Sequence, residues 1–169
     1  MNTIAHYQLR EDTMTQSKKT ADANTALFDY FNEIGIISQL AGNLFERKLP
    51  EGLTSSQFSV LNWFMRVDDE ASPGRLAAAF QVTAGAMTNT LKKLESKGLI
   101  RVEPDGSSGR QKRVTITAQG RRMRDKAIAS AAPLFAEFAA RFPAASIARQ
   151  TQDLQKVRQY LDEYRYRQG

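Results

Sequence analysis

Small, polar and basic side chains are gathered on one side of the segment from residue 83 to residue 97. Met87, Leu91 and Leu94 recur at spacings of four and three residues, which is the pattern of a helix that buries one face. The opposite face then carries Gly85, Thr88, Asn89, Lys92 and Ser96, with Lys93 at its edge. Asparagine can bind an adenine edge with two hydrogen bonds, threonine can contact a base or a thymine methyl group, and lysine suits phosphates. An ordinary amphipathic surface helix has the same division, so DNA reading is predicted only together with the segment that follows.

A basic loop follows this helix. Residues 99–103 and 113–117 have the composition of two strands, and the proline- and glycine-rich stretch 104–109 between them predicts a turn. The candidate DNA contacts of this loop are Arg110, Lys112 and Arg113. An arginine on a loop of glycines and serines suits the narrow minor groove, whose negative potential attracts a guanidinium group. The alternative is a solvated hairpin loop, but a basic loop between two strands directly after a reading helix predicts a wing.

Helix-start patterns accompany these two elements. Thr54 with Gln57 forms a capping-box pattern, and Ser72 before Pro73 combines an N-cap residue with a proline in the first helical position. Thr83 can cap the reading helix, and a glycine follows the end of that helix. Three short helices with a tight turn between the last two predict a helix-turn-helix unit. Ser72 and Thr83 are also included among the candidate DNA contacts.

Long segments with apolar residues at helical spacing flank this lobe. We predict a polar, mobile N-terminal arm at 1–23, an N-terminal dimerisation helix at 24–52, the winged helix-turn-helix lobe at 53–117, and C-terminal dimerisation helices at 118–169. Pro133 is expected to kink or break the last region. The predicted interface residues are Leu27, Phe31, Leu154, Val157, Leu161 and Tyr164. Because the small lobe cannot cover both apolar faces, a homodimer is favoured over a monomeric bundle.

The composition limits the chemistry that the chain can do. The 169 residues carry a formal net charge of +6, and the stretch 75–126 holds 12 basic residues against 4 acidic ones, which favours an anionic partner. There is no cysteine, and the only histidine, His6, lies in the polar arm, so no metal site, cofactor or enzyme activity is expected. We find no signal peptide and no apolar stretch long enough for a membrane span, so we expect a cytoplasmic protein without a membrane partner.

Three stretches of the sequence form a specific pattern because of their order and spacing. They are LTSSQF at 53–58, LKKLESKGLI at 91–100 and VTITAQGR at 114–121. Together they resemble the multiple-antibiotic-resistance regulator (MarR) family of winged helix-turn-helix transcriptional regulators. That family usually carries Asp-x-Arg in its wing, whereas here Ser108 stands at the aspartate position before Arg110. Either Asp105 braces Arg110 from the loop, or Arg110 is held more loosely.

The resemblance implies a function and a sensing site. It implies a repressor that binds a pseudo-palindromic duplex operator as a homodimer, with two reading helices about 34–36 Å apart. Family members commonly bind small aromatic or lipophilic acids between the dimer helices and the DNA-binding lobe, so a small-molecule effector is implied as well. The candidate pocket residues are Phe45, Trp63 and Met123, unless they pack in the core or the interface. We therefore predict a mainly α fold with a small β-wing and sequence-specific DNA binding. The alternative function is a winged-helix module that binds protein or RNA.

Overall fold

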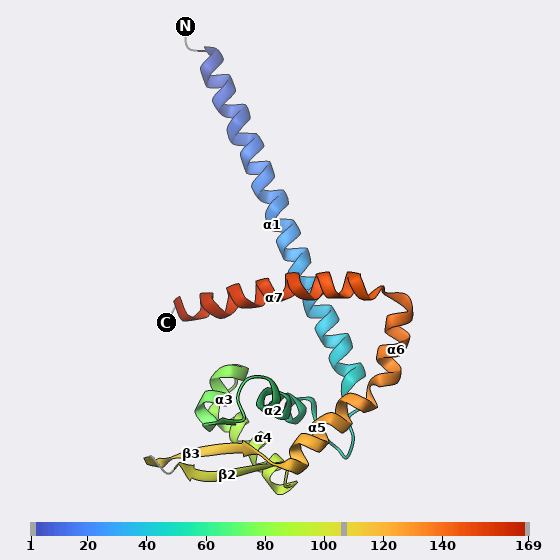
Figure 1. Ribbon diagram of the computed structural model, residues 1–169. Coiled ribbons are helices and arrows are strands. Elements are labelled where there is room, and N and C mark those ends of the chain that lie inside the picture. The colour runs from blue at the N-terminus through green and yellow to red at the C-terminus, as the bar shows by residue number, and fades with distance from the viewer. Residues whose placement is uncertain (1–2, 106–107, 168–169) are drawn as a thin grey trace. The chain divides into compact units, whose positions relative to one another are not determined.

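The computed structural model describes the backbone of residues 3–105 and 108–167, and the side chains within these stretches except those of 3–21, 108–110 and Tyr166. The described residues form seven helices and a three-stranded antiparallel sheet (Figure 1). The predicted fold, mainly α with a small β-wing, is therefore confirmed. The chain divides into two compact units, which are described separately below.

The first unit, residues 1–47, consists of one helix, α1 (Thr3–Glu46). The helix begins earlier than the predicted start at residue 24, so the structure differs there from the predicted arm. The segment before residue 24 lacks apolar periodicity, but it contains no proline or glycine and many residues of good helix propensity, which let a helix continue. Among the side chains described in this unit none is buried, and Leu27 and Phe31 are 57% and 46% exposed. The helix therefore carries a large apolar surface.

The second unit, residues 48–169, begins with a lobe of three helices and the sheet. The elements of the lobe are α2 (Ser55–Arg66), β1 (Glu70–Ala71), α3 (Pro73–Phe80), α4 (Ala84–Ser96), β2 (Ile100–Asp105) and β3 (Ser108–Ile116). Its fully buried side chains come from all three helices and from the wing; they are Val60, Leu61, Leu76, Leu94, Leu99 and Val114. Burying one such aliphatic side chain contributes about 1.5–3 kcal/mol. One continuous core therefore holds the helices and the wing together.

Each helix of the lobe begins at a residue whose side chain caps it, as predicted. Thr54 Oγ1 accepts a hydrogen bond from the Gln57 amide (3.3 Å), and the Gln57 side chain accepts one in return from the Thr54 amide (3.4 Å). Ser72 and Thr83 each accept from the amide three residues further on, at 3.1 and 3.2 Å. Each cap satisfies an amide that has no partner inside the helix and is worth about 1 kcal/mol. These local bonds fix where α2, α3 and α4 begin.

The strands are arranged in the order β1–β3–β2. Strand β1 was not predicted, because two residues are too few for a pattern; it pairs Glu70 with Thr115 of β3. Both wing strands extend into the stretch 104–109 that was predicted as a turn, and β2 includes Pro104. An edge strand tolerates a proline because it does not need every amide for pairing, and the register shifts beside this residue. The wing is therefore longer than the sequence pattern indicated.

Three helices complete the unit: α5 (Ala118–Ser130), α6 (Ala132–Arg141) and α7 (Ala144–Arg167). Pro133 lies in the first turn of α6, which confirms the predicted break. Met123 and Ala127 of α5 belong to the core of the lobe. The large exposed apolar side chains of α6, of its C-cap and of α7 are Phe135, Phe138, Phe142, Leu154, Tyr160, Leu161 and Tyr164. Within the described stretches, no helix has the length and apolar character needed to cross a bilayer.

Candidate nucleic-acid interface

Helix α4 has the predicted division into a packed face and an open face. Met87, Leu91 and Leu94 are 3%, 4% and 0% exposed. The residues of the open face are all exposed: Gly85, Thr88, Asn89, Lys92, Lys93 and Ser96. The helix therefore presents an amide, two hydroxyl and two ammonium groups to the solvent while its other side is held in the core.

The turn before α4 depends on an unusual backbone conformation. Gln81 ends α3 in the left-handed region, with φ 53° and ψ 42°. Its amide donates to the carbonyl groups of Ala77 and Ala78, and the Val82 amide donates to Ala77 at 3.0 Å. These bonds close the end of α3 within two residues of the Thr83 cap. The short connection sets the angle between α3 and α4.

The start of α5 packs against the turn that follows α4. Gly98 has a positive φ of 69°, and its carbonyl accepts a hydrogen bond from Thr117 Oγ1 at 2.8 Å. The Gln119 side-chain amide donates to the Lys97 carbonyl at 3.3 Å. A Cβ atom on Gly120 would overlap the carbonyl oxygen of Leu99, so the first turn of α5 lies directly against this turn. The position of α4 is thus tied to that of α5.

Lys97 ties the same end of α4 to the segment that enters α2. Its Nζ donates to the Gly52 carbonyl at 2.8 Å and to Gln57 Oε1 at 3.2 Å. Gln57 is only 3% exposed, and it accepts this bond in addition to its bond in the capping box. The amide oxygen can accept two hydrogen bonds, and Lys97 supplies the second one, so Lys97 stabilises this junction. The residue therefore has a structural position, distinct from that of the exposed Lys92 and Lys93.

The wing is attached to α4 and to β1 by polar contacts. Glu95 Oε1 accepts a hydrogen bond from the Val102 amide of β2 at 3.1 Å. Lys112 and Arg113 of β3 are exposed, and Arg113 Nη1 lies 3.4 Å from Glu70 Oε2. The side chain of Arg110, predicted to enter the minor groove, lies outside the described residues, as does that of Ser108. The wing thus has a fixed position beside α4.

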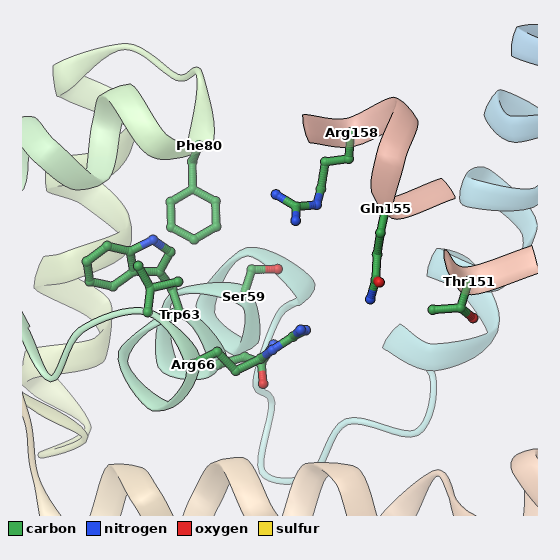
Figure 2. Close-up of a pocket in the computed structure, with 9 residues that line it drawn as sticks. Ser59, Trp63, Arg66, Phe80, Thr151, Gln155 and Arg158 are labelled. Carbon is green, nitrogen blue, oxygen red and sulfur yellow. The ribbon is translucent and has the colours of Figure 1, made fainter. Parts of the chain in front are cut away.

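A cavity of about 670 Å³ lies between the lobe and α7 (Figure 2). Figure 2 shows Trp63 and Phe80 on one side and Gln155 and Arg158 on the other. The lining residues are Ser59, Asn62, Trp63, Arg66, Val67, Phe80, Thr151, Gln155 and Arg158. Aromatic rings and guanidinium groups together suit a ligand with an apolar ring and a negative charge. Sequence reasoning had singled out Trp63 alone of this set, because the others converge from three helices.

The other two predicted pocket residues do not line this cavity. Met123 is 9% exposed and packs in the hydrophobic core of the lobe. Phe45 belongs to α1, in the first unit. Among the described residues, no group of three or more His, Asp or Glu side chains is placed to hold a metal ion.

The predicted interface residues are spread over α1 and α7. Leu27 and Phe31 of α1, and Leu154, Leu161 and Tyr164 of α7, are 45% exposed or more. Val157 is partly buried. Exposed leucine, phenylalanine and tyrosine side chains at helical spacing are typical of surfaces that another chain covers.

Two capped helices joined by a tight turn, followed by a hairpin attached to the second helix, define a winged helix-turn-helix protein. Residues 51–111 match the model of the MarR family. The structure is similar to the apo form of MarR from E. coli, with 26% identity, coverage of 75% of this chain and 93% of that chain, and a TM-score of 0.65. It is also similar to the transcriptional regulator BldR from Sulfolobus solfataricus, with 26% identity, coverage of 79% and 94%, and a TM-score of 0.68.

A third similar structure is a mutant of E. coli MarR complexed with operator DNA, with 26% identity, coverage of 75% of this chain and 91% of that chain, and a TM-score of 0.63. No curated protein matches the chain. The match over residues 51–111 and the similarity to these solved regulators support a winged helix regulator of the MarR family.

Proposed function

We propose that the chain binds duplex DNA sequence-specifically and represses transcription. The observation that carries this proposal is the open face of α4, where Thr88 and Asn89 are exposed beside Lys92 on a helix packed by its other side. A side chain that reads a base edge must be free of the core and held on a rigid element, and both conditions are met here. The similar MarR structure in complex with operator DNA supports the same use of the fold.

The contacts divide by chemistry. Helix α4 enters the major groove, where Thr88 and Asn89 meet base edges while Lys92 and Lys93 bind phosphates. The exposed wing residues Lys112 and Arg113, with Arg110, lie along the backbone and the minor groove. The helix starts at Ser72 and Thr83, together with Gly85, approach the phosphates most closely, because free amides at a helix N-terminus favour an anion.

The active form in this proposal is a homodimer. The apolar surfaces of α1 and α7 supply the interface, in which leucine and aromatic side chains that are exposed in the single chain become covered. A two-fold dimer sets the two α4 helices about one DNA turn apart, roughly 34–36 Å, and so requires a pseudo-palindromic operator.

The cavity beside Trp63 is the proposed effector site. Trp63 and Phe80 offer aromatic surface, and Arg66 and Arg158 offer positive charge, so a small aromatic acid fits the lining. Phe80 is the last residue of α3, the helix on which α4 is mounted. An occupant of the cavity therefore acts on the spacing of the two reading helices and releases the operator.

Selection of bound sequences from a random duplex library tests the proposal. The expected product is an inverted repeat with half-site centres about 10–11 base pairs apart, bound with a strong dependence on salt. An RNA hairpin of matched length serves as the competitor. Recovery of random sequences, or preferential binding of the RNA, would show that the winged helix serves as a different kind of interaction module.

A further inference from the structure

Three of the predicted DNA contacts line a depression beside the wing together with acidic side chains. The depression has a volume of about 310 Å³ and lies between β1, the start of α3 and β3. The predicted contacts that line it are Ser72, Lys112 and Arg113. The other charged residues that line it are Asp68, Glu70, Arg75 and Asp105. Carboxylates repel phosphates, so three of them weaken the attraction of this surface for DNA. Their presence therefore suggests a second role for the surface.

Two of these carboxylates are paired with arginines. Asp68 Oδ2 lies 2.6 Å from Arg75 Nη1, and Glu70 Oε2 lies 3.4 Å from Arg113 Nη1. All four side chains remain between 35% and 52% exposed, so water and a DNA phosphate can reach the pairs. Exposed ion pairs of this kind contribute little net free energy, so replacing one partner by a phosphate costs little.

The backbone holds both carboxylates in place. Glu70 belongs to β1, whose pairing with β3 sets it opposite Thr115, two residues from Arg113. Asp68 Oδ1 accepts a hydrogen bond from the Glu70 amide at 3.4 Å. The bond to Arg75 and this amide hold the pKa of the Asp68 carboxyl below its usual range, so the group is charged at neutral pH. The two carboxylates are therefore held beside their arginines by the backbone around them.

We propose that Asp68 and Glu70 are specificity-determining residues that occupy Arg75 and Arg113 until DNA is docked in register. This inference rests on the proposed DNA binding. In a loosely docked, non-specific complex the two arginines stay paired with the carboxylates and add no phosphate contact. When α4 is seated in the major groove of the operator, phosphates lie close enough to replace the carboxylates. The operator complex thus gains contacts that random DNA does not obtain.

Replacing Glu70 by glutamine, alone and together with Asp68→Asn, tests the proposal by binding titrations at several salt concentrations. The selected operator and a random duplex of equal length are compared. On random DNA we expect Glu70→Gln to tighten binding about 10-fold and to steepen the salt slope by about 0.9, the value for one added phosphate contact. On the operator the gain should be about 3-fold or less, with an unchanged slope, because Arg113 already contacts a phosphate there.

Asp69→Asn is the matched control. Asp69 is exposed between Asp68 and Glu70 and belongs to neither ion pair, so the variant changes the net charge equally without releasing Arg75 or Arg113. We expect Arg113→Ala added to Glu70→Gln to abolish the gain on random DNA. The proposal is overturned if Glu70→Gln behaves like Asp69→Asn, or if both DNAs gain equally. If the native protein shows no salt-dependent duplex binding, the proposed function itself fails, which is a distinguishable result.

Discussion

The guanidinium carbon of Arg75 lies 5.2 Å from the centre of the Trp63 ring. This cation–π contact joins the first turn of α3 to α2, and the same guanidinium is bonded to Asp68. Trp63 also lines the cavity beside α7. A single arginine therefore connects the cavity wall, the helix that supports α4, and the acidic residues beside the wing.

Trp63 is the only tryptophan of the chain, so its fluorescence reports this contact directly. We expect Arg75→Ala to make Trp63 more accessible to acrylamide and to lower the stability by about 0.5–1 kcal/mol, as for a cation–π pair at a partly exposed site. Arg75→Lys keeps the charge but not the planar group. Its acrylamide quenching and its stability should lie between those of Arg75→Ala and the native protein. Equal quenching in Arg75→Ala and the native protein would contradict the contact.

Asp68 should make the stability depend on pH in acid. Its pKa in the folded state is held below the usual value of 3.8, mainly by the hydrogen bond from Arg75. A lowered folded-state pKa gives a contribution that is complete above the unfolded-state value and is lost as the pH falls through the folded-state value. The unfolding free energies of the native protein and Asp68→Asn, measured in urea from about pH 6 to pH 2.5, should therefore converge only at the acid end. Asp69→Asn is the control, and a constant difference would refute the assignment.

The two kinds of contact proposed for α4 should separate in binding titrations. Asn89→Ala should cost about 1–3 kcal/mol on the operator and much less on random DNA, because it removes base contacts. Lys92→Ala should weaken both and reduce the magnitude of the salt slope by about 1. Arg110→Ala should weaken binding most where the wing meets a narrow, A·T-rich minor groove. Unchanged specificity in Asn89→Ala would show that another face of α4 reads the bases.

The contact between α5 and the turn after α4 should not tolerate a methyl group added at Gly120. We expect Gly120→Ala to destabilise the protein by about 1–3 kcal/mol, because the new Cβ would overlap a backbone carbonyl that cannot move freely. Gly85→Ala is the matched control, since it is also helical and its Cβ would meet open space. That change should stabilise the fold by roughly 0.5–1 kcal/mol. Thermal denaturation of both variants compares them, and similar melting temperatures would argue against the close approach.

The apolar surface of α7 should be required for assembly. We expect Leu154→Glu combined with Leu161→Glu to weaken the proposed dimer more than about 100-fold, because charges replace side chains that the partner would bury. Gln152→Glu, on an exposed position of the same helix, is the control. Sedimentation at micromolar concentration measures the effect. A native protein that sediments as a monomer would rule out the interface.

Local patterns predicted local structure well. The caps at Thr54, Ser72 and Thr83 and the break at Pro133 were predicted because each depends on residues within one helical turn. The buried face of α4 was predicted for a similar reason, because its apolar residues recur with the 3.6-residue period of a helix. The helix before residue 24 was missed because propensity alone supports it.

Features that depend on distant residues were not predictable. Strand β1 exists only because Glu70 and Ala71 pair with β3, more than forty residues later. The Glu70–Arg113 pair follows from that pairing. The cavity is lined by residues from α2, α3 and α7, and only Trp63 among them was predicted from the sequence as a pocket residue. Such groupings arise from tertiary packing, so no spacing along the chain predicts them.

Two roles are separated along α4. Glu95 and Lys97, at its C-terminal end, hold the wing and the junction with α2, whereas Thr88 and Asn89 lie about two turns earlier and are open to solvent. Substitutions at the open positions therefore leave the attachment of the helix intact. During divergence of duplicated copies, the recognised sequence can drift through many folded intermediates while the attachment stays under constraint. The same separation makes α4 a convenient site for reprogramming operator choice by design.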